Sequence, residues 1–220
     1  MTCPVVAFFD VDETLIASKS MFAVMRFYLE QTEGKAGLER FEVRLRCLRR
    51  LTAMGAPRVV INRLYYFFWR GTSANAVATA AAEWVVLRTT EPNFFLRPTV
   101  AALAMHRQRG DRIVLVSGSF PAVLEPLRIQ LGADDLLCTR PRIVNGRLTG
   151  WVEQPMIGAN KARAARYLMA RGGINPLACA AYGDHLSDLP LLELVGHPGV
   201  VPHDPSLVAI ARARNWRILT

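Results

Sequence analysis

The spacing of apolar residues changes twice along the chain. Residues 5–9 are five consecutive apolar residues, which is typical of a strand buried on both faces of a parallel sheet. Residues 18–89 instead place apolar side chains at helical spacing and predict a run of helices. After Arg97-Pro98, short apolar strands alternate with helical segments as far as the end of the chain.

The alternating part predicts a series of elements with a hairpin in its middle. Asn145-Gly146 predicts the hairpin, because both central residues of a type I′ turn need a positive φ. The other expected elements are helix 99–109, strand 112–116, helix 121–131, a short strand near 136, helix 160–170, strand 178–182, helix 188–195, strand 199–201, helix 205–214 and a last strand near 216–219.

This order of elements predicts the fold class, an α/β fold with a doubly wound parallel sheet. Strands that alternate with helices are joined by right-handed crossovers. We expect residues 1–17 and 96–220 to form the Rossmann-like core, with residues 18–95 as a helical cap inserted after the first strand. In such sheets ligands bind at the carboxyl ends of the strands.

Composition favours a soluble, cytoplasmic protein. Of 220 residues 51% are hydrophobic, so the chain can bury a substantial core. Charges interrupt every apolar stretch before the ~18 residues of a membrane span, and the N-terminus lacks signal-peptide order, so we expect no stable membrane insertion. Widely spaced cysteines without a CxxC pair argue against a zinc site or a disulfide framework. They are Cys3, Cys47, Cys138 and Cys179.

The net charge of +9 favours anionic ligands. The basic residues are 24 arginines and three lysines spread along the whole chain, without a nucleic-acid-binding motif. We therefore expect an anionic partner and not a nucleic acid, and the site residues described next narrow that partner to a small phosphorylated metabolite.

Three predicted strands end in residues that suit phosphate chemistry. Asp10 and Asp12 follow the first strand, Ser117-Gly118 follows the strand 112–116, and Asp184 follows the strand 178–182. A hydroxyl and a flexible turn before a helix present backbone N–H groups to an anion. Carboxylates from two strands suit Mg²⁺, which prefers oxygen ligands.

These residues can have separate roles in phosphoryl transfer. With metal, Lys161 and Ser117 around a phosphoryl group, a carboxylate oxygen of Asp10 can attack phosphorus. Asp12 can protonate the leaving alkoxide and later accept a proton from water.

The segments FFDVDETLI, VSGSF and YGDHLSDLPLL, together with Lys161, resemble the four ordered motifs of the haloacid dehalogenase-like (HAD) phosphatases. The resemblance is to the phosphoserine phosphatase-like branch, subfamily IB, and covers roughly residues 5–16 and 98–205, while 18–95 matches only in position and helical character. It implies Mg²⁺ dependence, an aspartyl-phosphate intermediate and a phosphatase rather than a dehalogenase. The implied roles are Asp10 as nucleophile, Asp10, Asp184 and the Asp12 carbonyl as metal ligands, Ser117, Gly118 and Lys161 as phosphate binders, and Asp188 as support for Lys161 or the metal waters.

The chain departs from that branch near the expected substrate amine. Lys19 stands where phosphoserine phosphatases place a glutamate, and a cation there repels an ammonium group. The fourth motif has His185 and Ser187 in place of Gly and Asn. We therefore expect Lys19 to contact a substrate that carries a carboxylate, a second phosphate or a polar neutral group instead of L-phosphoserine.

Several alternatives stay open at this stage. Residues 65–69, YYFFW, fit the core of the cap, or the lining of a substrate pocket or a subunit contact. Arg44, Arg46, Arg49 and Arg50 fit a solvated helix face, although one of them, or Arg63, can reach a leaving group. A lipid-phosphate phosphatase working at a membrane surface and a non-catalytic binding protein on the same fold are the rival functions. The oligomeric state and the substrate's identity are not predicted.

Overall fold

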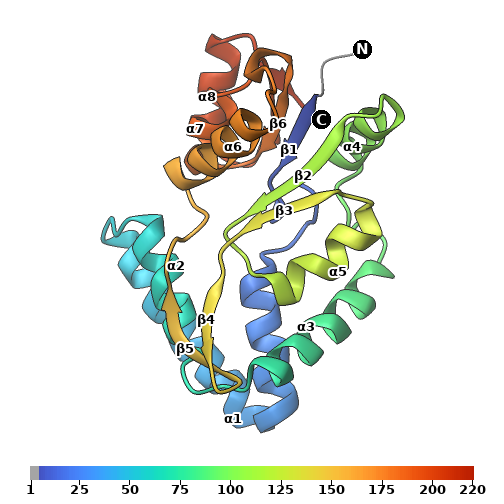
Figure 1. The fold of residues 1–220 in the computed structure, drawn as a ribbon. Coiled ribbons are helices and arrows are strands. Elements are labelled where there is room, and N and C mark those ends of the chain that lie inside the picture. The colour runs from blue at the N-terminus through green and yellow to red at the C-terminus, as the bar shows by residue number, and fades with distance from the viewer. Residues whose placement is uncertain (1–4) are drawn as a thin grey trace.

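The computed structural model describes residues 5–220, and within them a six-stranded parallel sheet has the order β3-β2-β1-β6-β7-β8. The prediction of a doubly wound parallel α/β fold is confirmed (Figure 1). The strands of this sheet are β1 (Val6–Phe9), β2 (Arg112–Ser117), β3 (Asp135–Cys138), β6 (Ala180–Gly183), β7 (His197–Val200) and β8 (Arg217–Ile218).

Helices cover both faces of the sheet, as the apolar run of the first strand predicts. Val6 and Phe8 point to one face and Ala7 and Phe9 to the other, and all four are fully buried. The first face packs on α6 (Ala159–Arg171), α7 (Leu189–Leu192) and α8 (Pro205–Ala213). The second packs on α4 (Arg97–Gln108) and α5 (Pro121–Leu131).

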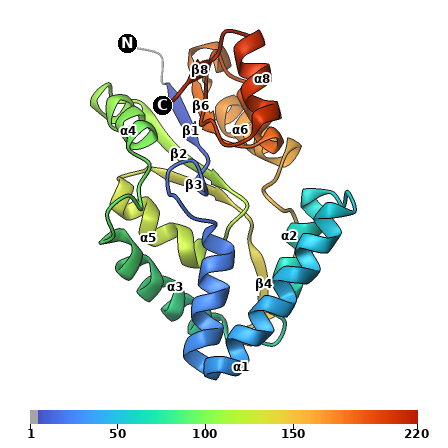
Figure 2. The ribbon, with the colours of Figure 1, turned by 180° about the vertical axis from the view of Figure 1, so that it is seen from behind.

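The helices of the 18–95 segment lie beyond the carboxyl ends of the strands (Figures 1 and 2). They are α1 (Ser20–Ala53), α2 (Arg58–Phe67) and α3 (Ala74–Thr89). Gly34, with φ 59° and ψ −131°, interrupts α1 and lets its second half fold back. At Gly37 the two halves approach so closely that an added Cβ would overlap the Leu29 carbonyl.

The predicted hairpin is formed by β4 (Pro141–Val144) and β5 (Arg147–Val152). Asn145 and Gly146 have φ of 48° and 72°, the signs that a type I′ turn needs. The hairpin lies against α2 rather than against the central sheet, and the backbone of residues 71–74 hydrogen-bonds to Gly146 and Leu148. The hairpin, although distant in sequence, thereby holds the backbone that connects α2 to α3.

Two boundaries differ from expectation around the last motif. The expected helix 188–195 is a 3-10 turn, η2 (Leu186–Asp188), followed by the single turn of α7 (Leu189–Leu192). His185 and Asp188 form a capping box at the start of η2, and Pro190 lies in the first turn of α7, where its missing N–H is tolerated. A further 3-10 turn, η1 (Pro176–Ala178), precedes β6.

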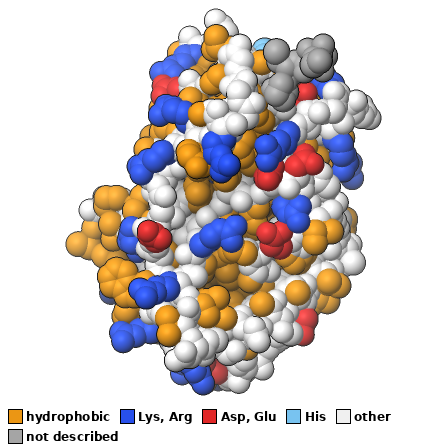
Figure 3. Space-filling model, in the orientation of Figure 1, with side chains coloured by type: hydrophobic (Ala, Val, Ile, Leu, Met, Phe, Trp, Pro, Cys, Tyr) orange, Lys and Arg blue, Asp and Glu red, His pale blue; other side chains and the backbone are white. Residues whose placement is uncertain are grey.

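Three of the four cysteines lie in the part of the chain that the structure describes. Cys47, Cys138 and Cys179 are free thiols, while Cys3 lies outside the described residues. Over residues 5–220 we find no helix with the length and apolar character needed to cross a bilayer. Lys and Arg side chains are dispersed over the face seen in Figure 3 and do not form one block.

Candidate active site

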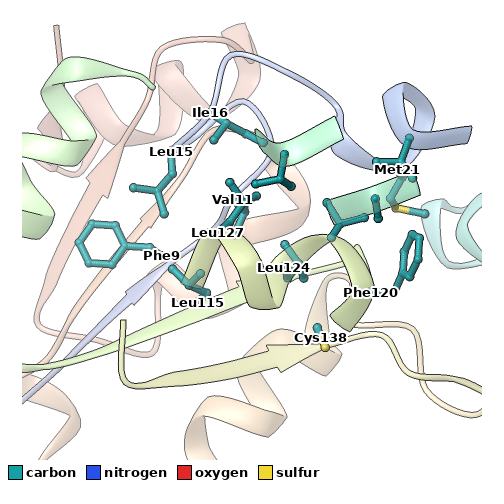
Figure 4. Close-up of a cluster of buried hydrophobic side chains, with 14 of the residues drawn as sticks. Phe9, Val11, Leu15, Ile16, Met21, Leu115, Phe120, Leu124, Leu127 and Cys138 are labelled. Carbon is teal, nitrogen blue, oxygen red and sulfur yellow. The ribbon is translucent and has the colours of Figure 1, made fainter. Parts of the chain in front are cut away.

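The loop after β1 holds its two aspartates on a buried apolar base. Val11, Leu15 and Ile16 are fully buried beside α5 (Figure 4). The backbone N–H groups of Leu15 and Ile16 both donate to the Val11 carbonyl, at 2.8 and 3.1 Å. Asp10 N–H donates to the Tyr182 carbonyl at 2.9 Å, which fixes this residue to the neighbouring strand β6. With Val11 turned into the core, the residues on either side of it are free to face the carboxyl edge of the sheet.

Lys161 is the buried cation of this edge. It lies in the first turn of α6 and is 3% exposed. Its Nζ lies 2.7 Å from Asp10 Oδ1 and 2.7 Å from Asp188 Oδ1. Burial lowers the pKa of this ammonium, but the two carboxylates more than offset that effect, so its pKa is raised overall. Lys161 is therefore charged across the physiological pH range.

Three buried carboxylates gather around this position and fit a metal ion. One oxygen each of Asp10, Asp184 and Asp188 lies within 4.8 Å of the others. Thr14 Oγ1 donates to Asp184 Oδ1 at 3.0 Å, which orients that carboxylate. Lys161 pairs with two of the three, so a divalent cation held by oxygen ligands would relieve the remaining repulsion. The donor set is that of a hard cation such as Mg²⁺.

The raised pKa values of these carboxylates also favour a bound cation. Burial, with added repulsion from Asp10 and Asp188, raises the pKa of Asp184 to about 8. Burial also raises the pKa of Asp10, although Lys161 opposes the change. Without a further cation the cluster holds protons to unusually high pH.

Asp12 has a separate environment. Its Oδ1 accepts a hydrogen bond of 3.1 Å from the backbone N–H of Ser20, the first residue of α1. Its enclosure, assisted by the charge of Asp10 and opposed by the Ser20 bond, raises the pKa of Asp12 to about 7. A carboxyl group with this pKa can both donate and accept a proton near neutral pH.

Ser117 and Gly118 form the turn after β2. Ser117 Oγ accepts from the backbone N–H of Ser119 at 3.1 Å. The Gly118 carbonyl accepts from Asn62 Nδ2 at 3.1 Å and from the Tyr66 hydroxyl at 2.9 Å, two groups on α2. A Cβ at position 118 would lie 2.5 Å from Ile157 Cδ1, so glycine allows Ile157 to pack closely against this turn.

A cavity of about 410 Å³ brings the predicted residues together. Those that line it are Asp10, Asp12, Lys19, Ser117, Gly118, Lys161 and Asp184. Asp188 does not line the cavity and reaches it through Lys161. Lys19 is exposed and pairs with Glu13 at 3.1 Å, so its charge is partly engaged.

Sequence reasoning missed residues that line the cavity from α2. Arg58, Ile61 and Asn62 all face it. Asn62 is buried, and its Oδ1 has no hydrogen-bond partner among the described residues. Nothing in a single sequence distinguishes these positions from others on a helix whose packing partner is unknown. Thr14 and Ser20 were also missed, although both belong to the segment that carries Asp10 and Asp12.

The other candidates differ in how close they lie to the cavity. Arg63 donates to the carbonyls of Val152 and Glu153 at 2.7 and 3.0 Å, which gives it a structural contact. Tyr65, Tyr66 and Trp69 are buried, and of the 65–69 run Tyr65 lines the cavity. His185 lies at the rim, where its Nδ1 accepts from the backbone N–H of Ser187 at 3.0 Å.

The fold and this edge together define an α/β protein with an acidic, phosphate-compatible site. Residues 7–193 match the family model for haloacid dehalogenase-like hydrolases. The chain therefore belongs to this hydrolase family, and the predicted resemblance is confirmed.

Relatives agree with this assignment. The chain is 32% identical over 220 residues to an inhibition of morphological differentiation protein of Streptomyces azureus, covering 97% of this chain and 77% of that protein. It is 31% identical over 221 residues to a probable phosphatase of Mycobacterium tuberculosis, covering 97% and 74%. A substrate-bound phosphoserine phosphatase has a similar fold, with a TM-score of 0.70, 18% identity and coverage of 95% of this chain and 91% of that chain. The assignment as an enzyme of this family is thus confirmed.

Proposed function

We propose that this hydrolase is a Mg²⁺-dependent phosphomonoesterase that acts on a small organic phosphate. The observation that carries the proposal is the pairing of Asp10 with Lys161 at 2.7 Å in a cavity that Asp12, Ser117 and Asp184 also line. A buried cation beside a carboxylate nucleophile is what phosphoryl transfer to an aspartate requires.

Asp10, Asp184 and the backbone carbonyl of Asp12 would hold Mg²⁺, which when bound would neutralise charge on the phosphate oxygens. Lys161, the Ser117 hydroxyl and the N–H of Gly118 would bind the same phosphate from the other side. Asp188 would hold Lys161 in place, as its 2.7 Å contact with Nζ suggests.

The reaction would proceed in two displacements. An oxygen of Asp10 attacks phosphorus, the bond from phosphorus to the ester oxygen breaks, and Asp12 gives its proton to the departing alcohol. Asp12 then removes a proton from water, which attacks the phosphorus of the aspartyl phosphate and releases inorganic phosphate. A pKa of about 7 for Asp12 suits both transfers.

We also propose that residues 18–95 act as a cap and that residues 1–17 and 96–220 form the core. The cap would open to admit substrate and close to exclude bulk water. Its hydrogen bonds to Gly118 from Asn62 and Tyr66 support this, because they join the cap to the phosphate-binding turn.

Two cationic side chains that line the cavity favour an anionic or neutral substrate over one that carries an amino group. Lys19 and Arg58 line the cavity, and Lys19 is paired with Glu13, which also lines it. O-phosphoserine is therefore disfavoured relative to phosphates that bear a carboxylate, a second phosphate or a neutral group. A cytoplasmic location and a metabolite rather than a nucleic acid as partner remain predictions.

Hydrolysis of para-nitrophenyl phosphate tests the proposal. Wild type with Mg²⁺ should release phosphate, EDTA should stop the release and added Mg²⁺ should restore it, while Asp10→Asn should be inactive with or without metal. Failure of wild type to release phosphate would favour the non-catalytic binding protein. Strong stimulation by anionic vesicles would favour the lipid-phosphate phosphatase.

A further inference from the structure

A second hollow lies between α1 and α3 and shares two lining residues with the active-site cavity. It measures about 510 Å³, and Lys19 and Phe22 line both this groove and the cavity. These two residues lie at the start of α1, where the chain leaves the catalytic loop. The groove and the cavity therefore adjoin at the start of α1.

The groove has an apolar lining beneath a charged rim. Phe41 and Trp84 are buried, and Phe22, Ala23 and Phe27 are half-buried. Leu87 is the exposed apolar member of the lining, on α3. The charged members lie mostly at the surface, and Arg88 pairs there with Glu91 at 2.7 Å. A groove with apolar residues that adjoins a phosphate site suits an apolar extension of the same ligand.

The cavity itself shows the same change of character away from the carboxylates. Met21, Phe22, Ile61 and Tyr65 line it on the side of α1 and α2. The end of the site with the carboxylates is thus polar, whereas the side formed by α1 and α2 adds these apolar side chains to the polar Thr52, Arg58 and Asn62. Figure 2 shows α1 and α3 side by side beyond the strands, which is where the groove runs.

We infer that the substrate is the phosphomonoester of an apolar alcohol, whose chain or ring passes Lys19 and Phe22 and lies in the groove between α1 and α3. The inference rests on the proposed phosphatase function and names the substrate class of that site. Burial of the apolar part supplies binding energy remote from the phosphate, at about a 4-fold gain for each methylene group removed from water.

A series of n-alkyl phosphates below their micelle concentrations tests the inference. The ratio of kcat/KM for octyl phosphate to that for ethyl phosphate should be at least about 50 in wild type. Leu87→Glu places a charge in the groove and should reduce this ratio about 10-fold or more. Val86→Glu is the matched control, because Val86 is the neighbouring residue of α3, is 66% exposed against 57% for Leu87, and does not line the groove. It should keep the wild-type ratio.

A ratio near one, or an equal fall in both variants, would overturn the inference while leaving phosphatase activity intact. Loss of all phosphate release would instead refute the proposed function. In that case titration calorimetry with Asp10→Asn still tests the role of the groove. Octyl phosphate should bind at least 10-fold more tightly than ethyl phosphate, and equal affinities would overturn the inference.

A last arm separates a free amphiphile from a lipid. Activity on octyl phosphate in solution that exceeds activity on dioleoyl phosphatidic acid in vesicles indicates a soluble apolar phosphate. The reverse order indicates that the groove receives a chain from a membrane. Both results place the apolar chain in the groove when Leu87→Glu, and not Val86→Glu, abolishes the preference.

Discussion

Lys161 Nζ lies 2.7 Å from Asp10 Oδ1 and at the same distance from Asp188 Oδ1, so one buried ammonium joins the carboxylate that follows β1 to another at the end of η2. All three residues are nearly inaccessible to solvent. In such surroundings an ion pair is stable only if each charge keeps its partner. Lys161 therefore serves the acidic cluster, in addition to its proposed contact with the phosphate.

Replacement of Lys161 should therefore cost activity and stability together. Lys161→Met leaves three buried carboxylates without their cation, and kcat/KM for para-nitrophenyl phosphate should fall about 100- to 1000-fold. The free energy of unfolding should fall by about 3–5 kcal/mol. Lys161→Arg keeps the charge but does not fit the slot of a compact ammonium, so it should restore less than a tenth of the activity.

The matched control for this variant is Lys35→Met, since Lys35 is an exposed lysine of α1. It should behave as wild type in both measurements. Wild-type kinetics in Lys161→Met would contradict the role given to Lys161 in binding phosphate.

The acidic cluster should also make metal-free stability depend on pH. The pKa of Asp12 is raised to about 7 and that of Asp184 to about 8, so between pH 4 and pH 8 the folded chain binds more protons than the unfolded chain. Stability then falls as pH rises through this window. Thermal melting in EDTA should show a declining Tm, and the gain in Tm from added Mg²⁺ should grow from pH 5 to pH 8.

Asp184→Asn provides the control for the pH dependence. It removes a titrating group without changing shape, so the decline in Tm should be shallower and the gain from Mg²⁺ should shrink. A Tm in EDTA that rises between pH 5 and pH 8 would be incompatible with a cluster that holds excess protons.

Most of the sheet and its carboxyl edge were predictable because they depend on local rules. Parallel strands end at one edge, which is why Asp10, Ser117 and Asp184 were expected to converge, and they line one cavity. The type I′ turn at Asn145-Gly146 was predictable because few residues tolerate two positive φ values in succession.

The parts that the sequence did not reveal depend on packing between distant elements. Asn62 and Arg58 reach the cavity only because α2 is oriented by its contacts with β5 and the turn at Gly118, and helical spacing carries no information about that orientation. The single turn of α7 likewise depends on the capping of η2 by Asp188, a residue whose other task is to bind Lys161. Interactions of this kind leave only a weak signal in sequence patterns, because tertiary contacts override local helix propensity.

Gly183, the last residue of β6, should be required for the position of Asp188. A Cβ at this position would lie 2.8 Å from Asp188 Cβ and 2.9 Å from its Oδ2. Gly183→Ala should displace that carboxylate from Lys161, lower kcat/KM at least 10-fold and cost about 1–3 kcal/mol of stability.

A double-mutant cycle tests whether this loss acts through Asp188. If it does, adding Gly183→Ala to Asp188→Asn should cost much less activity than it does in wild type. Additive losses would show that Gly183 acts by another route, such as its backbone contact with Val201.

Two arginines on α2 should separate substrate binding from structural support. Arg58 lies exposed in the first turn and lines the cavity, and its charge contributes to lowering the pKa of His185, after burial. Arg63, five residues later, donates to the carbonyls of Val152 and Glu153 on and beside β5. Because Arg58 touches no described partner by hydrogen bond, Arg58→Ala should leave Tm within about 1 °C while raising KM for an anionic phosphate about 10-fold.

Arg63→Ala should have the opposite effect, since it removes two charge-assisted hydrogen bonds that join α2 to the hairpin. A loss of about 1.5–3 kcal/mol corresponds to a fall in Tm of about 3–10 °C for a chain of this size. KM should stay within 2-fold of wild type, because the side chain does not line the cavity. Steady-state kinetics and thermal melting on the same preparations distinguish the two roles. A large increase in KM in Arg63→Ala with unchanged Tm would place the leaving-group contact on Arg63 instead of Arg58.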